Sequence, residues 1–177
     1  MVAAMMGQDA TARIDSDQRP YWSSDQGWRV FAYPAEEMCD IGLSTVSGEY
    51  VTVGYWPKAA VASLMVTNRH ATSLRAGDTK RLVVGFAKAP GQRFGSVHEM
   101  SSEVLDAEGS LVLSATETYP SFLDDFAGSG VMGVLNPGGG VVAAIPLGGS
   151  SQAVARLRAC AIEAAGLDPE DPFLPQR

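Results

Sequence analysis

Apolar and polar positions alternate along most of the chain with a period of two, which is typical of half-buried β-strands. In residues 38–46, for example, Cys39 and Ile41 fall on one face, whereas Asp40 and Gly42 fall on the other. The pattern, with glycine and proline between the segments, predicts strands over 28–33, 38–46, 50–56, 61–67, 81–86, 94–105, 110–116, 131–135 and 141–147.

The period changes to that of a helix at two places. Phe122 and Phe126 are four residues apart and predict a short helix that begins at Ser121 and ends at Gly128. A second helix is predicted from Ser150 to about residue 165, with apolar residues along one stripe. Each helix starts with a serine, which we expect to cap it.

Short strands joined by short turns favour an antiparallel β fold over a parallel α/β fold. We therefore expect a mainly β protein, either an antiparallel β-sandwich or a partly open barrel, with the C-terminal helix covering an open edge. The length of 177 residues suits a single core. The expected organisation is a flexible N-terminal tail over 1–26, one β domain over 27–166, and an irregular tail over 167–177.

The overall charge disfavours some partners. The net charge of −7 repels phosphate backbones and anionic lipid surfaces, and the basic residues are scattered. No apolar run approaches the roughly 18 residues of a membrane span. We expect neither a nucleic-acid partner nor a membrane-spanning segment. Residues 1–18 are open to two interpretations, a flexible tail or the remnant of a trimmed signal peptide.

The chain has two cysteines, Cys39 and Cys160, far apart in sequence. This spacing does not suit a metal knuckle, which needs clustered ligands. The two cysteines either form one disulfide between an early strand and the last helix, or remain buried free thiols. In the chain-entropy model, a bridge closing so long a loop would stabilise the fold by about 4–5 kcal/mol.

Candidate catalytic residues are few. His70 and His98 are the only histidines, and a Ser–His or Cys–His arrangement would have to use one of them as its base. No G-x-S-x-G motif is present, and both histidines lie in polar segments where exposure is the ordinary outcome. Asp124 and Asp125 are adjacent on a helix, point about 100° apart, and are expected to lie on a solvated face.

Metal and cofactor signals are weak. His70 and His98 with Glu99 or Glu103 have no specific metal-ligand spacing. Residues 128–133 match the dinucleotide fingerprint, but that fingerprint needs a strand before it and a helix after it. Here the predicted order is reversed. We expect no metal and no cofactor.

Aromatic residues gather in or beside the early strands. Trp28, Tyr55 and Trp56 either fill the core or line an open groove for a ligand or partner. The core is the ordinary location for aromatic residues in strands. These three are nevertheless the candidate binding residues.

Both ends of the domain carry short motifs. Trp28–Val30 opens it, Cys39 follows, and the end reads Ala144–Ser150 before Ala153 and Leu157. In these features the chain resembles the invasion-associated locus B family of secreted or periplasmic α-proteobacterial proteins, although it lacks that family's additional mid-domain cysteines. The resemblance implies an exported β-sandwich without enzyme activity and assigns no catalytic residue.

These observations favour a non-enzymatic, exported (periplasmic or secreted) bacterial module that binds an unidentified protein or small molecule. One alternative is a cytosolic β domain that binds a small molecule near Trp28, Tyr55 or Trp56. A second alternative is an enzyme that uses His70 or His98 beside a carboxylate in a concave site.

Overall fold

The computed structural model describes residues 17–46, 48–67, 73–107, 110–118 and 121–171. Strands make up most of the described secondary structure, and its two α-helices lie in the C-terminal third of the chain. The strands are β1 (Arg19–Ser23), β2 (Arg29–Tyr33), β3 (Met38–Ser44), β4 (Tyr50–Trp56), β5 (Val61–Thr67), β6 (Thr79–Ala87), β7 (Ser96–Ala107), β8 (Ser110–Thr118), β9 (Val131–Leu135) and β10 (Val141–Pro146). The helices are the 3₁₀ turn η1 (Pro34–Glu36), α1 (Ser121–Gly128) and α2 (Ser150–Ala164).

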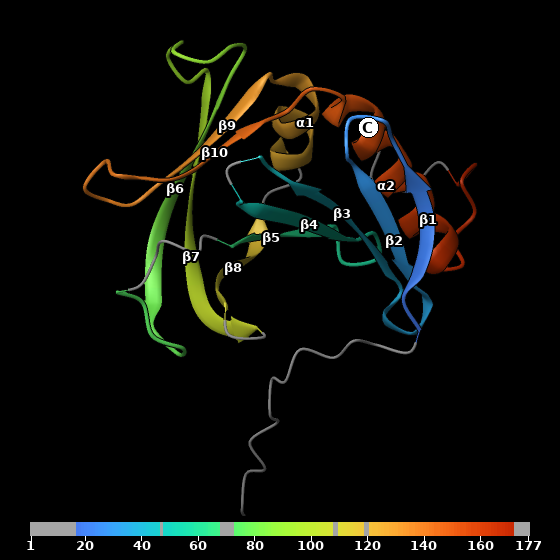
Figure 1. Ribbon diagram of the computed structural model, residues 1–177. Helices are drawn as coiled ribbons and strands as arrows, with labels where there is room; N and C mark the ends of the chain where they lie inside the picture. The colour runs from blue at the N-terminus through green and yellow to red at the C-terminus, as the bar shows by residue number, and fades with distance from the viewer. Residues whose placement is uncertain (1–16, 47, 68–72, 108–109, 119–120, 172–177) are drawn as a thin grey trace, which may run out of the picture.

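The described strands form one antiparallel ladder in the order β1-β2-β3-β4-β5-β8-β7-β6-β9-β10. The first half is a meander from β1 to β5, and the pairing of β5 with β8 joins it to the second half. Figure 1 shows the first half towards the right and the second half towards the left. No described pairing joins β1 to β10, so the curled ladder does not close into a barrel. The predicted mainly β, antiparallel fold with a short helix and a C-terminal helix is confirmed.

One face of the ladder, called here the inner face, carries the core. Along β3, Cys39, Ile41 and Leu43 are buried on this face, as the alternation predicts. Strand pairing carries the same face through the ladder, because directly paired residues point to the same side. Buried residues of the second half, such as Val84 and Phe86 of β6, continue this face. The remaining side, called here the outer face, includes Asp40.

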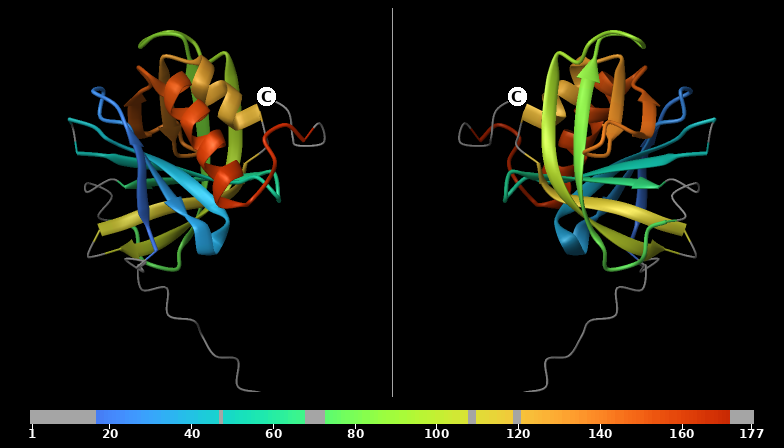
Figure 2. Two further views of the ribbon diagram at one scale, coloured as in Figure 1. Left: turned by 90° about the vertical axis from the view of Figure 1, so that its right-hand side faces the viewer. Right: turned by 90° about the vertical axis from the view of Figure 1, so that its left-hand side faces the viewer.

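The two helices cover part of the inner face. Helix α2 packs on β2, β3 and β4, and α1 packs against α2. Figure 2 shows α2 crossing the first half of the ladder with α1 beside it. The buried stripe of α2 includes Val154, Leu157 and Cys160, whereas Arg156 and Glu163 are exposed. This is the amphipathic pattern predicted for the helix.

Trp28 links the first half of the ladder to both helices. Its side chain is fully buried, and its ring meets Phe126 of α1 edge to face at 5.7 Å between centroids. Its indole Nε1 donates a hydrogen bond of 2.6 Å to the carbonyl of Gly148, just before α2. The buried ring is therefore satisfied both in its apolar body and in its polar group.

The disulfide Cys39–Cys160 joins β3 to α2 across 121 residues of sequence. Both cysteines are buried, at 0% and 1% exposure. Of the two interpretations of the cysteines, the bridge is the one present in the structure. It fixes the covering helix to the middle of the first half.

Two local predictions were wrong. Arg19–Ser23 lies inside the expected flexible tail but forms β1, which pairs antiparallel with β2. The expected serine cap of α2 is absent, because Gly149 is the N-cap residue, in a left-handed conformation with φ of 78°. The Ser150 hydroxyl instead donates to the carbonyl of Phe126, at 2.9 Å, and ties the two helices together.

Removal of the disulfide should destabilise the protein strongly. We expect reduction of the wild type to lower its free energy of unfolding by about 2–5 kcal/mol, because the open chain regains conformational freedom. Urea denaturation with and without reductant measures this loss. The double variant Cys39→Ala, Cys160→Ala is the control and should not respond to reductant. Equal stability of the oxidised and reduced wild type would contradict the prediction.

Candidate functional site

Asp40 is a carboxyl group on the outer face of β3, in the middle of the first half. It lies directly across from Phe31 of β2 and from Gly54 of β4. The side chain is only partly open to solvent. Aspartate is uncommon inside strands, and here it stands between an apolar ring and a glycine.

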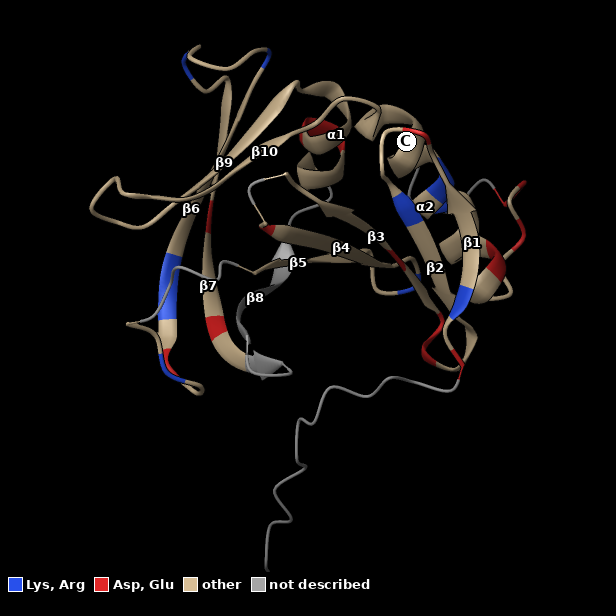
Figure 3. Cartoon of the chain, in the orientation of Figure 1, with Lys and Arg blue, Asp and Glu red and all other residues tan. Residues whose placement is uncertain are grey.

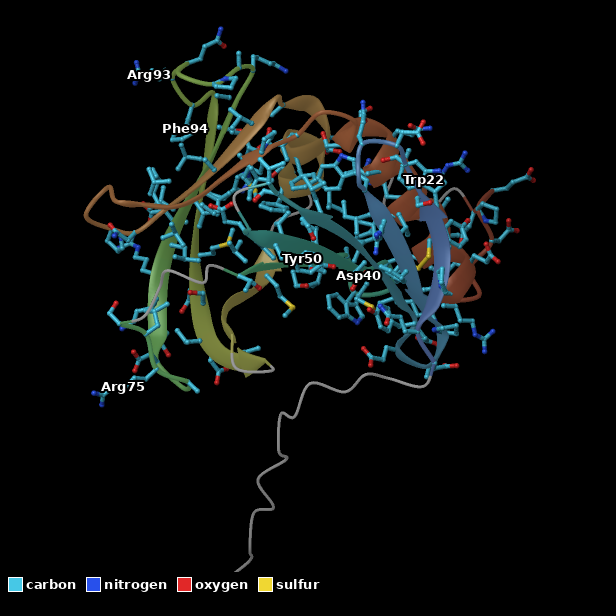
Figure 4. All side chains as sticks on the ribbon, viewed as in Figure 1. Trp22, Asp40, Tyr50, Arg75, Arg93 and Phe94 are labelled. Carbon is cyan, nitrogen blue, oxygen red and sulfur yellow. A yellow bond between two sulfur atoms is a disulfide. The ribbon has the colours of Figure 1, made fainter. Side chains whose placement is uncertain are left out.

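One aromatic side chain contacts this carboxyl group, and two more lie beside neighbouring glycines. The Tyr33 hydroxyl donates a hydrogen bond of 3.0 Å to Asp40 Oδ2, and Gln18 Nε2 donates one of 2.8 Å to the Tyr33 hydroxyl. Tyr50 and Trp56 of β4 lie next to Gly42 and Gly54, the glycines beside and across from Asp40. Figure 4 labels Asp40 and Tyr50 near the middle of the molecule. We call Tyr33, Asp40, Tyr50 and Trp56 the Asp40 cluster.

Two glycines make room for the cluster. A methyl group on Gly42 would collide with the hydroxyl of Tyr50, which lies over this glycine. A methyl group on Gly54 would stand 2.9 Å from Met38 Cε and from Ser63 Oγ, and 3.1 Å from Trp56 Cζ3. The missing side chains therefore leave room for the Tyr50 hydroxyl and the Trp56 ring close to the strands beside Asp40.

Burial dominates the electrostatics of the cluster. It raises the pKa of Asp40 from its ordinary 3.8 to about 6, although the hydrogen bond from Tyr33 favours the charged form. Burial, followed by the nearby Asp40 charge, raises the pKa of Tyr33. No ion pair joins Asp40 to a lysine, arginine or histidine in the described part of the chain. Asp40 is thus a desolvated acid whose one hydrogen-bond donor is neutral.

The second oxygen of Asp40 is accessible. Among residues 17–46 and the other described segments, no buried side-chain nitrogen or oxygen lacks a partner. Tyr33 donates to Oδ2. No described donor reaches the other oxygen, which therefore keeps some contact with solvent. The carboxylate can therefore accept a further hydrogen bond from outside.

The structure does not bring the three candidate binding aromatics together. Trp28 is in the core and has no contact with solvent. Tyr55 and Trp56 are neighbours on one strand and so point to opposite faces. Tyr55 lies on the inner side, half-buried, near Arg158, while Trp56 belongs to the Asp40 cluster. A ligand role for Tyr55 or Trp56 stays a prediction, and one ligand cannot touch all three.

The sequence predicts an exposed His98, and this prediction is wrong, because His98 lies on the inner face. Its side chain is 11% exposed, and Nε2 stands 2.7 Å from Asp125 Oδ2 of α1. The ring also meets Phe86 and Phe122 edge to face at 5.7 and 5.5 Å. Because a carboxylate only accepts, the imidazole donates this bond. Asp125 is consequently a partner of His98, whereas Asp124 pairs at the surface with Arg158.

The His98–Asp125 pair has the orientation of a base and its acid, but no described hydroxyl or thiol hydrogen-bonds to the imidazole. A nucleophilic arrangement needs that third group. What the pair does in the structure is hold α1 over β7. His70, the other candidate base, lies outside the described residues.

The other chemical signals do not form a site. No three histidine, cysteine or acidic side chains gather closely enough to hold a metal ion, as far as the described residues show. Helix α1 ends at Gly128 and β9 starts at Val131, so the glycine motif has a helix before it and a strand after it. This is the reverse of the order that pyrophosphate binding requires.

Sequence reasoning missed Tyr33, Asp40 and Tyr50 as site residues. One signal was available in the sequence. Aspartate is unusual within an alternating strand, and Gly42 follows Asp40 two residues later, on the same face. The contact with Tyr33 depends on the turn around η1, which folds β3 back on β2. Alternation alone does not give that neighbour.

No protein-family model, no curated protein and no solved structure matches this chain. None of the described helices is long and apolar enough to cross a membrane. Figure 3 shows the described lysines and arginines dispersed over both halves of the ladder. The absence of a nucleic-acid partner stays a prediction.

The stability contribution of Asp40 should depend on pH. Because the pKa is higher in the folded state than in the unfolded state, Asp40 costs no stability below about pH 3.8, where it is protonated in both states. The free energy of unfolding then falls as the pH rises through about 6. The difference between pKa values of 3.8 and about 6 corresponds to a free-energy change of about 3 kcal/mol, which contact with solvent reduces. Asp40→Asn should therefore gain about 2–3 kcal/mol over the wild type between pH 4 and pH 7.

Urea denaturation of both proteins at the two pH values measures this difference. Asp25→Asn, which changes an exposed carboxyl group by the same charge, is the matched control and should show no such gain. If the free energies of unfolding of Asp40→Asn and the wild type differ by the same amount at both pH values, the prediction of a raised Asp40 pKa is wrong.

The His98–Asp125 pair should stabilise the docking of α1. In a double-mutant cycle with His98→Gln and Asp125→Asn, we expect a coupling energy of about 1 kcal/mol at neutral pH. The value is modest because the Asp125 side chain is 32% exposed. Urea unfolding of the two single variants and the double variant gives the coupling. Additive effects would mean that the pair contributes nothing beyond its separate residues.

Proposed function

We propose that the chain is a non-enzymatic module, exported to the periplasm or secreted, which binds a partner through the outer face of its β domain. The observation that carries the proposal is the buried Cys39–Cys160 disulfide. Stable disulfides form in oxidising compartments and are rare in the cytosol. The resemblance at the two ends of the domain to exported proteins supports the same location.

The bridge has the environment of a structural disulfide. Both cysteines are buried between β3 and α2, and no third cysteine exists to exchange with them. Reactive cysteines usually sit in partly exposed, electropositive surroundings. The burial therefore favours a permanent cross-link over a catalytic or sensing pair.

The binding part of the proposal is supported by the Asp40 cluster. The cluster combines aromatic surface with an incompletely paired carboxyl group on the face that α2 does not cover. The best-formed candidate for catalysis, His98 with Asp125, uses its hydrogen bond to hold a helix in place. A binding role explains the Asp40 cluster and does not require the His98–Asp125 pair to be catalytic.

The alternative is a cytosolic β domain that binds a small molecule. It differs from the first proposal in the state of the cysteines, because cytosolic reductants keep thiols free.

The decisive experiment is the intact mass of protein taken from its native host in the presence of an alkylating agent, without reductant. We expect no alkylation after denaturation. A tryptic digest should contain the segment 30–58 linked to the segment 159–177, which carry Cys39 and Cys160. A reduced and denatured sample is the control and should take up two alkyl groups.

Free thiols in the unreduced sample would overturn the export proposal. The cytosolic alternative would then lead, and thermal-shift measurements with metabolites would follow, since a ligand that binds only the folded state raises the midpoint of unfolding.

A further inference from the structure

The outer-face carboxyl group of Asp40 is set up to receive a positive charge. It is partly buried, and the described residues place only a neutral donor, the Tyr33 hydroxyl, against it. A buried carboxylate without a cation is costly, and an approaching cation offsets that cost. The accessible oxygen marks the position at which such a partner would bind.

The surrounding rings favour an organic cation. Tyr33 contacts the carboxyl group, and Tyr50 and Trp56 lie beside the neighbouring glycines. Aromatic faces attract ammonium and guanidinium groups. Metal ions instead require several oxygen or nitrogen ligands. Asp40 belongs to no group of three possible metal ligands among the described residues.

The hydrogen bonding favours ammonium over guanidinium. A guanidinium group binds best with two parallel hydrogen bonds to both oxygens of a carboxylate. Here Oδ2 already accepts from Tyr33, so a guanidinium that used both oxygens would have to share Oδ2 with that hydroxyl. An ammonium group is compact and needs only a single acceptor in line with it.

We propose that the Asp40 cluster binds a primary ammonium group, carried either by a free alkylamine or by a lysine side chain of a partner protein. The ammonium group donates to the open oxygen of Asp40, and its alkyl chain lies against Tyr50 and Trp56. This inference rests on the proposed binding function and names the chemistry of the ligand.

The described titratable and charged groups that face Asp40 leave its charge without a cation. Tyr33 faces it from β2, and Tyr50 lies over Gly42 on the adjacent strand. Arg29, directly across from Gly42, is exposed and forms no ion pair with Asp40. The carboxyl group is therefore not neutralised by this chain's own described residues.

The test is a titration of the full-length protein with n-butylammonium chloride at pH 7, followed by the amide chemical shifts of β3 and β4. We expect saturable shifts around Asp40, Gly42 and Gly54, and none of comparable size with the neutral analogue n-butanol. Asp40→Asn keeps the hydrogen bond from Tyr33 but removes the charge, and should bind at least tenfold more weakly. Asp25→Asn is the matched control and should bind like the wild type.

The pH dependence provides a second readout that needs no variant. Binding requires the ionised carboxyl group, so the wild type should bind n-butylammonium about tenfold more weakly at pH 5 than at pH 7. This readout decides the matter if Asp40→Asn fails to fold. Affinity that is equal at the two pH values, or equal in Asp40→Asn and the wild type, would overturn the proposal.

The source of the ammonium group is distinguished by a second ligand, Nα-acetyl-lysine N-methylamide. Tighter binding of this ligand than of n-butylammonium indicates a lysine side chain, and weaker binding indicates a free amine. The outcome is independent of the cysteine chemistry. Bridged cysteines without amine binding would support export and overturn the ammonium site. Amine binding with free thiols would support the ammonium site and overturn export.

Discussion

An open ladder of strands must bury its inner face against something other than more strands. In this protein the two helices provide that cover. The two ends of the ladder, β1 and β10, do not pair, so the first half would otherwise expose the apolar residues of β2, β3 and β4. Helix α2 covers them, and α1 fills the space beside it. Burial of apolar surface of this kind is the dominant favourable contribution to folding.

A connected set of aromatic rings couples this cover to both halves. Trp28 directly precedes β2, Phe122 and Phe126 belong to α1, and Phe86 belongs to β6. The rings meet mainly edge to face. His98 joins the same set at its border. The disulfide and the Ser150 hydrogen bond then fix α2 in direction as well as in position. The inner face is thus specified by residues from almost the whole length of the chain, while the outer face carries Asp40 together with apolar side chains such as Met38.

The sequence was sufficient for the strands and helices, because one-sided burial imposes a period on them. The exception is β1, whose residues are nearly all exposed and include Pro20 at an irregular pairing. Such an edge strand buries no regular face and so leaves no pattern. The same period of two could have predicted that Tyr55 and Trp56 lie on opposite faces of the ladder, since adjacent residues of a strand point to opposite sides.

The candidate site was much less predictable. Tyr33 meets Asp40 because of strand order and the turn at η1, and Asp125 meets His98 because α1 docks over the second half. The first is a diagonal contact between two strands of one hairpin and depends on their register, whereas the second joins a strand to a helix. Periodicity assigns a residue to a face but does not name the residue opposite to it, so a polar pair created by tertiary packing has no signature in a single sequence.

The position of the cysteines also sets an order of events during synthesis. Cys39 leaves the ribosome 121 residues before Cys160, so its thiol waits unpaired while most of the ladder is made. Once α2 has docked, both sulfur atoms are enclosed by β3 and the helix. Oxidation must therefore take place before or during docking, while an oxidant can still reach the thiols. The last helix of the domain is both the group that completes the cross-link and the cover that seals it from further exchange.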